Sequence, residues 1–214
     1  MAIGDQVTNV QVGKNYVVYP WHGCGTCKVC RRGDENLCTN GRSLGLFQPG
    51  GYADYVLVAD ARYLVDIGDM SPVQAAPYAC SGLTTYSAIR KIKDQVLKDE
   101  KVVLFGAGGL GFMAITLIKA LGGAGVLVVE SDESKHAAVL KAGADAVFNP
   151  RTPGVADEIK KAAGGSVWAI LDCVGTNQTI QMGMDLLVKG GNSSRSVCSA
   201  ATSTFRRPSW SSRP

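Results

Sequence analysis

Four cysteines near the start of the chain have the spacing of metal ligands. Cys24, Cys27, Cys30 and Cys38 follow the pattern C-x2-C-x2-C-x7-C. Four thiolates this close can surround one tetrahedral Zn²⁺ at about 2.3 Å each. An iron–sulfur cluster is one alternative, but the bacterial run closes after three residues and a proline, whereas Thr39 follows Cys38. Disulfides are the other alternative, and they need an oxidising compartment. A closed set of four thiolates leaves no open position, so the pattern predicts a structural zinc that holds a loop.

A second set of residues suited to chemistry is a glycine loop. The apolar run 102–105 feeds into Gly106-Ala107-Gly108-Gly109-Leu110-Gly111, and an apolar, Ala-rich segment follows. This order predicts a strand, a tight turn and a helix, which is the context that a dinucleotide fingerprint G-x-G-x-x-G requires. We expect Gly106 to make the turn, Gly108 to let the backbone approach a pyrophosphate, and Gly111 to let helix and strand pack closely. The helix start at Gly109 and Leu110 would offer N–H groups to the phosphates.

An acidic residue stands where such a fingerprint needs one. Glu130 ends the apolar run after the predicted helix and lies 24 residues after Gly106. An acid about 20 residues beyond the loop binds the ribose hydroxyls of NAD, whereas NADP carries a 2′-phosphate that an acid repels. The alternative is a solvated acid at a strand end, which the spacing from the glycine loop disfavours. The sequence therefore predicts NAD as the coenzyme.

Composition excludes several classes of protein. The 214 residues are 46% hydrophobic, with no apolar run of membrane-spanning length and no signal-peptide pattern after Met1, so we expect a cytoplasmic protein without a membrane partner. The net charge of +4 resides in residues 192–214, which hold four arginines and no acid. Subtracting these from 22 basic residues leaves 18 against 18 acidic residues. A formally neutral body argues against a nucleic-acid partner.

The elements that position these residues form two groups. Short strands are predicted within residues 1–20 and 50–66, and a helix from Thr84 to about Ile92. From Lys101 onward strands and helices alternate, which predicts an α/β fold with a parallel sheet. The predicted strands are Lys101–Phe105, Gly125–Glu130, Ala146–Phe148 and Val167–Asp172, and the predicted helices are Leu110–Leu121, Glu133–Ala142, Val155–Ala163 and Thr176–Val188. A further strand is due after Gly191, but residues 192–214 are rich in Ser and Arg, so we expect a disordered tail.

Across residues 4–191 the chain resembles the zinc-dependent medium-chain alcohol dehydrogenases, in its glycine loop, its cysteine lobe and the context of Cys80 together. The resemblance implies a partial GroES-like domain in residues 1–80, with a zinc lobe at 24–38. It implies an incomplete Rossmann domain, a doubly wound parallel sheet, in residues 81–191.

The resemblance also implies site residues. The four cysteines correspond to the lobe-zinc ligands, and the glycine loop to the coenzyme loop. Glu130 corresponds to the ribose-binding acid, with Lys135 as its basic partner. Thr84 corresponds to a residue of the nicotinamide pocket, and Cys173 and Val174 to a segment beside the coenzyme.

Cys80 corresponds to a ligand of the catalytic zinc, which in this family acts as a Lewis acid on a small alcohol or carbonyl substrate. The family's other ligands are an N-terminal cysteine and a His-Glu pair, and neither His22 nor His136 stands in that context. One thiolate cannot hold a catalytic zinc, which needs about three protein ligands. We therefore expect the missing segment to lie upstream of Met1, and a reading-frame shift near Gly191 to have replaced the next strand.

The resemblance therefore implies an NAD-dependent alcohol dehydrogenase, and the missing ligands predict a truncated and catalytically impaired form. A non-catalytic NAD- and zinc-binding remnant is the alternative. A zinc-ribbon nucleic-acid binder is a third hypothesis, which the neutral body argues against. Family members are homo-oligomers that associate through sheet edges, and we do not expect those edges in this C-terminus. The particular alcohol is not predicted, because the segments that shape the substrate pocket are among those expected to be missing.

Overall fold

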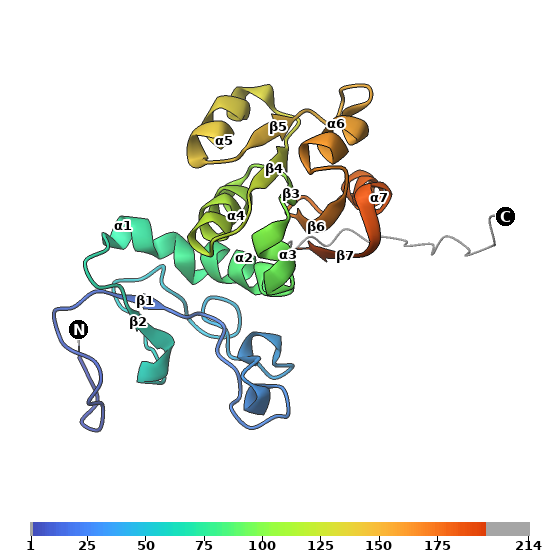
Figure 1. Cartoon of the computed structure of the whole chain (residues 1–214). Helices are drawn as coiled ribbons and strands as arrows, with labels where there is room; N and C mark the ends of the chain where they lie inside the picture. Colours follow the sequence, from blue (N-terminus) through green and yellow to red (C-terminus); the bar gives the residue numbers. More distant parts are fainter. Residues whose placement is uncertain (1, 196–214) are drawn as a thin grey trace. The chain divides into compact units, whose positions relative to one another are not determined.

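The computed structural model describes residues 2–195, and the chain divides into two compact units, Met1–Leu83 and Thr84–Pro214 (Figure 1). The division falls within α2 (Ser81–Ile89), three residues beyond the predicted domain boundary at residue 80. Within the part of the chain that the structure describes, no helix has both the length and the apolar character that a membrane crossing requires.

The first unit contains little regular structure. Its strands β1 (Tyr16–Val18) and β2 (Leu64–Asp66) pair antiparallel, with Val17 opposite Val65. The remaining elements of this unit are short helical segments: η1 (Cys30–Arg32), η2 (Glu35–Leu37), η3 (Ala61–Tyr63), α1 (Pro72–Ala75) and η4 (Ala76–Ala79).

The strands predicted within residues 1–20 and 50–66 are only partly present. Residues 50–58 form no strand, and Tyr52, Tyr55 and Leu57 are exposed. An apolar alternation becomes a strand only when its backbone groups find a ladder partner. Among residues 2–195 this segment has none, so the prediction was wrong there.

The second unit is a five-stranded parallel sheet with the strand order β5-β4-β3-β6-β7. This confirms the predicted α/β fold with a parallel sheet. The strands are β3 (Val102–Phe105), β4 (Val126–Val129), β5 (Ala146–Phe148), β6 (Val167–Asp172) and β7 (Leu187–Arg195). The helices that belong wholly to this unit are α3 (Asp94–Asp99), α4 (Gly109–Ala120), η5 (Glu133–Lys135), α5 (His136–Ala142), α6 (Val155–Ala162) and α7 (Asn177–Leu186).

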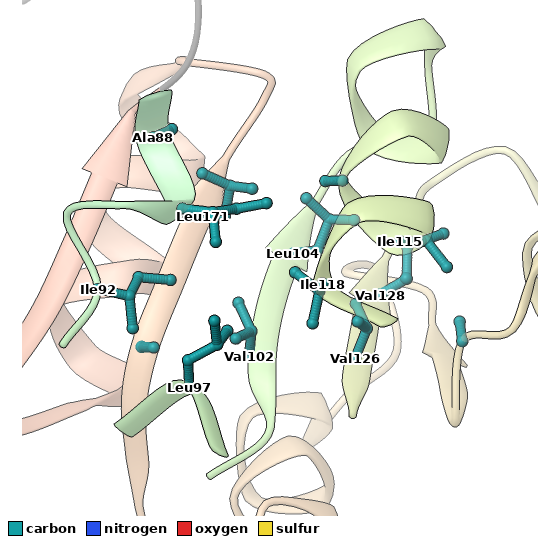
Figure 2. Close-up of a cluster of buried hydrophobic side chains, with 14 of the residues drawn as sticks. Ala88, Ile92, Leu97, Val102, Leu104, Ile115, Ile118, Val126, Val128 and Leu171 are labelled. Carbon is teal, nitrogen blue, oxygen red and sulfur yellow. The ribbon is translucent and has the colours of Figure 1, made fainter. Parts of the chain in front are cut away.

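The sheet is covered by apolar packing on both faces. Successive residues of a strand point to opposite faces, so strands without polar residues bury two cores. On one face Leu104 packs with Ile115 and Ile118 of α4 (Figure 2). On the other face Phe105 packs with Ile159 of α6. The glycine loop between β3 and α4 is therefore anchored at both ends by buried side chains.

The strand order reverses at β3. From β3 the chain adds β4 and then β5 on one side, and afterwards places β6 and β7 on the other side. The carboxyl ends of β3 and β6 therefore flank a topological switch point, where open α/β sheets bind their ligands. Both the glycine loop and the segment containing Cys173 begin at this point.

Strand β7 corrects the prediction that regular structure ends at Gly191. The strand continues to Arg195, where Asn192 lies opposite Ala169 and Ser194 opposite Leu171 of β6. Ladder hydrogen bonds join backbone groups, so a polar segment can still complete a sheet. Placing polar side chains in this strand is unfavourable, because Asn192 Oδ1 and Ser194 Oγ are buried without a hydrogen-bond partner among the described residues. Residues 196–214, on which the rest of the tail and frame-shift predictions fall, lie outside the described residues.

Candidate functional site

The four lobe cysteines converge on one point. The Sγ–Sγ distances are 3.9 Å for Cys24–Cys30, 3.4 Å for Cys27–Cys30 and 3.8 Å for Cys27–Cys38, and all four atoms lie within 4.8 Å of one another. A tetrahedral ion with Zn–S bonds of about 2.3 Å needs edges of roughly 3.8 Å. The spacing suits one ion shared by four thiolates. It is too wide for a disulfide, whose S–S bond is about 2.05 Å, and these cysteines are free.

The lobe backbone also supplies donors to the sulfur atoms. The backbone N–H of Cys27 donates to Cys24 Sγ at 3.3 Å, and that of Cys30 donates to Cys27 Sγ at 3.4 Å. Hydrogen bonds from the Thr26 hydroxyl and from the backbone at Thr26 and Cys27 lower the pKa of Cys24 to about 5. Burial and the neighbouring thiols raise the pKa of Cys30 to about 12. A zinc ion binds thiolates, so its binding to the lobe would release the remaining protons.

The three fingerprint glycines of the loop differ in conformation and in the space around them. Gly106 follows β3 with φ of +89°, a left-handed conformation that side chains rarely adopt. Gly108 is exposed, and a Cβ there would meet no atom within 4 Å. Gly111 is buried, and a Cβ there would lie 3.0 Å from the Gly106 carbonyl carbon and closer still to its oxygen. The space beside the Gly108 Cα is thus open to a ligand, whereas the space beside the Gly111 Cα is occupied by the Gly106 backbone.

Glu130 lies at the end of β4 and faces this loop. Its side chain is 9% exposed, with Oε2 accepting from Ala107 N at 2.7 Å and Oε1 accepting from Asp132 N at 2.9 Å. Lys135 Nζ lies 4.0 Å from Oε2. Burial alone would raise the pKa of Glu130, but the two backbone donors and Lys135 outweigh it and lower that pKa. Glu130 is therefore an anion at neutral pH, held against the first turn of the loop.

The segment after β6 adjoins the same loop. The Cys173 backbone N–H donates to the Phe105 carbonyl at 3.0 Å, and a Cβ on Gly106 would lie 2.6 Å from Val174 Cγ2. Burial, reinforced by Asp172, raises the pKa of Cys173 to about 12, so its thiol is neutral at pH 7. The structure thus brings Cys173 and Val174 to the loop, while their role toward a coenzyme stays a prediction.

Asp172 is a residue that the sequence analysis passed over. Its Oδ1 accepts from the backbone N–H groups of Val174 and Gly175, each at 2.9 Å, and its Oδ2 accepts from the Thr179 hydroxyl at 2.9 Å. Asp172 therefore shapes the turn that presents Val174. The available signal was an Asp at a strand end followed by Thr-x-x-Thr, since Thr176 and Thr179 form a capping box on α7.

Two predicted residues lie away from these constellations. Cys80 is exposed at the end of η4. Residues 2–195 contain one group of three or more His, Cys, Asp or Glu side chains able to share a metal, and it consists of the four lobe cysteines. Thr84 lies half-buried in α2. The assignments of Cys80 to a catalytic zinc and of Thr84 to a nicotinamide pocket stay predictions.

A doubly wound sheet with a glycine loop and a strand-end acid at its switch point, joined to a four-thiolate lobe, defines the class of zinc-containing dinucleotide-binding dehydrogenases. Residues 1–69 match the family model of the alcohol dehydrogenase GroES-like domain, and residues 109–200 match that of the zinc-binding dehydrogenases. The chain belongs to the zinc-dependent medium-chain alcohol dehydrogenase family.

Individual relatives agree with this assignment. The NAD-dependent alcohol dehydrogenase of Sulfurisphaera tokodaii is 39% identical over 190 residues, which cover 88% of this chain and 54% of that protein. The enzyme of the same name from Saccharolobus solfataricus is 37% identical over the same coverage. The crystal structure of D-arabinose dehydrogenase from Sulfolobus solfataricus superposes with a TM-score of 0.79 at 31% identity, over 88% of this chain and 59% of that one. The chain spans about half the length of the curated relatives it matches.

Proposed function

We propose that the chain binds NAD at the switch point of its sheet and a structural zinc in its cysteine lobe. The observation that carries the coenzyme proposal is Glu130, an ionised carboxylate that contacts the glycine loop at Ala107 N while Gly108 stays open to a ligand. The observation that supports the zinc proposal is the single-ion spacing of the four Sγ atoms. Both sites are built from residues of one unit each, so each can be tested by itself.

In this proposal each residue of the coenzyme site has a separate task. The N–H groups at the start of α4 bind the pyrophosphate, which can approach because Gly108 has no side chain. Glu130 accepts hydrogen bonds from the ribose hydroxyls and repels a 2′-phosphate. The backbone N–H groups of Ala107 and Asp132 hold the carboxylate in place, and Lys135 places a positive charge beside it. Thr84, Cys173 and Val174 border the nicotinamide. Bound NAD supplies the hydride-transfer chemistry.

We infer that the substrate class is a small alcohol or its carbonyl product, because the most similar relatives named above are alcohol dehydrogenases. This substrate class applies to a catalytic site that has all of its zinc ligands. We further propose that this polypeptide alone has negligible alcohol dehydrogenase activity. The support is that Cys80 shares no metal-binding group with other described residues, and a catalytic zinc needs about three protein ligands. In that case the chain acts as a coenzyme- and zinc-binding module. Turnover of a simple alcohol by the purified chain, at a rate typical of enzymes, would contradict this part.

A titration of the purified chain with NADH and NADPH, followed by nicotinamide fluorescence, tests the coenzyme site. We expect saturable binding of NADH and weaker binding of NADPH. Glu130→Gln should reduce the difference in affinity between NADH and NADPH, because the neutral amide no longer repels the 2′-phosphate of NADPH. Glu158→Gln is the matched control, since Glu158 is exposed on α6 and its charge lies outside the coenzyme site. No NADH binding by the wild-type chain would overturn the proposal.

A further inference from the structure

A carboxylate outside the four ligands ties the cysteine lobe to the strand region of its unit. Glu35 Oε2 accepts from the Gly23 backbone N–H at 3.1 Å and from the Tyr63 hydroxyl at 2.6 Å. Glu35 Oε1 lies 3.2 Å from the Arg62 guanidinium. Arg62 and Tyr63 belong to η3, directly before β2, whereas Gly23 directly precedes Cys24. One side chain therefore joins the residue before the first ligand to a residue 28 positions beyond Glu35.

The contact at Gly23 is close enough to constrain the ligand loop. A Cβ on Gly23 would lie 2.6 Å from Cys30 Sγ and 2.9 Å from Glu35 Cβ. The Gly23 backbone is therefore packed between a zinc-ligand sulfur and the Glu35 stem. Glu35 therefore contacts the backbone that leads directly into Cys24.

The other side of the network is buried and closely packed. Tyr63 is buried, and its ring stacks on His22 with the ring centres 3.9 Å apart. His22 is also buried, and its Nδ1 lies 3.2 Å from Gln48 Nε2. The Tyr63 hydroxyl thus reaches Glu35 from a buried and stacked ring. A short hydrogen bond from a fixed donor to a carboxylate restricts the position of that carboxylate.

We propose that Glu35 is a positioning residue of the zinc lobe. By holding Gly23 N–H, the Tyr63 hydroxyl and the Arg62 guanidinium together, it sets the ligand loop in its metal-binding arrangement without touching the metal. Groups outside the ligand set that fix the ligands commonly change metal affinity by about 10- to 100-fold when they are removed. The proposal rests on the proposed zinc site of the lobe.

The experiment compares zinc affinity in the full-length chain by competition with a chromogenic chelator. Glu35→Gln keeps the side-chain shape but loses the charge and one acceptor, and we expect about a 10-fold weaker zinc affinity. Asp34→Asn is the matched control, because Asp34 is the adjacent exposed acid and should have wild-type affinity. Cobalt substituted for zinc should give the same thiolate-to-metal absorption in all three chains, since the four ligands are unchanged.

Tyr63→Phe supplies an independent test, because it removes the hydroxyl and keeps the stacked ring. If Glu35 acts through this contact, the double variant should be weaker than wild type by less than the product of the two single effects. Wild-type zinc affinity in Glu35→Gln, or an equal loss in Asp34→Asn, would overturn the inference. If Glu35→Gln does not fold, wild-type affinity in Tyr63→Phe would overturn it. A wild-type chain with no cobalt absorption would instead refute the zinc site itself.

Discussion

Gly108 and Gly111 lie three residues apart, one before α4 and one within it, yet alanine should affect coenzyme binding at the first and folding stability at the second. In Gly111→Ala the new Cβ would lie 3.0 Å from the Gly106 carbonyl carbon and closer to its oxygen, both of them backbone atoms. Overlap of this kind costs about 1–3 kcal/mol, and backbone cannot swing aside as a side chain can. Alanine regains up to about 1 kcal/mol of helix propensity. Because the contact is closer than 3.0 Å and is made to backbone, the upper end of the overlap cost applies, and about 3 kcal/mol less about 1 kcal/mol of propensity leaves a net loss of about 2 kcal/mol in the free energy of unfolding.

In Gly108→Ala the new Cβ meets no protein atom within 4 Å, so we expect a change below about 0.5 kcal/mol in the free energy of unfolding. The same Cβ would occupy the space through which a pyrophosphate approaches. We therefore expect NADH binding to weaken by about tenfold or more, equivalent to at least about 1.4 kcal/mol. Gly111→Ala should thus lower the stability, whereas Gly108→Ala should lower the coenzyme affinity and leave the stability nearly unchanged.

The assays are urea unfolding followed by far-ultraviolet circular dichroism, to which α4 and the other long helices contribute most, and NADH titration. With a urea m-value of about 2 kcal/mol per molar, a loss of 2 kcal/mol moves the midpoint by about 1 M. Gly109→Ala is the control, because its Cβ also meets nothing within 4 Å and should leave the midpoint unchanged or slightly raised. A wild-type midpoint in Gly111→Ala, or unimpaired NADH binding in Gly108→Ala, would refute the reasoning.

Three further changes test other parts of the molecule. Cys38→Ser should abolish stoichiometric zinc and the cobalt–thiolate absorption, whereas Cys80→Ser should leave both intact, and equal loss in the two would contradict the closed lobe. Because the folded-state pKa of Glu130 is lowered, its contribution to stability is present above about pH 4.5 and is lost as the pH falls through the folded value. The unfolding free energy of Glu130→Gln should therefore fall less on acidification than that of the wild type, and parallel pH profiles would contradict this. Ser194→Ala removes a buried hydroxyl without a partner among the described residues, so the urea midpoint should rise by the equivalent of about 1 kcal/mol, while Ser193→Ala, at an exposed position of the same strand, should change little.

Much of the second unit could be predicted from the sequence because its signals are local. Four apolar residues before Gly106 and the helical segment after Gly111 identify β3 and α4 without any knowledge of distant contacts. The strand after α4 runs parallel to β3 in a βαβ unit, so Glu130, which follows that strand, is expected at the same edge of the sheet as the glycine loop. The lobe cysteines are local too, since a C-x2-C-x2-C run already brings three sulfur atoms within reach of one ion.

The sequence by itself therefore determined the order of the main elements of the second unit, the glycine loop and the clustering of the four cysteines. Only the tertiary structure decided which segments find partners. Residues 50–58 have a strand pattern but no ladder partner among the described residues, whereas the polar residues 192–195 form a strand because β6 pairs with their backbone. Tertiary structure also joined Glu35 to Tyr63 and aimed Asp172 at the turn after β6. Such contacts depend on how the folded chain brings backbone and side-chain groups together, and spacing along the sequence carries no record of that.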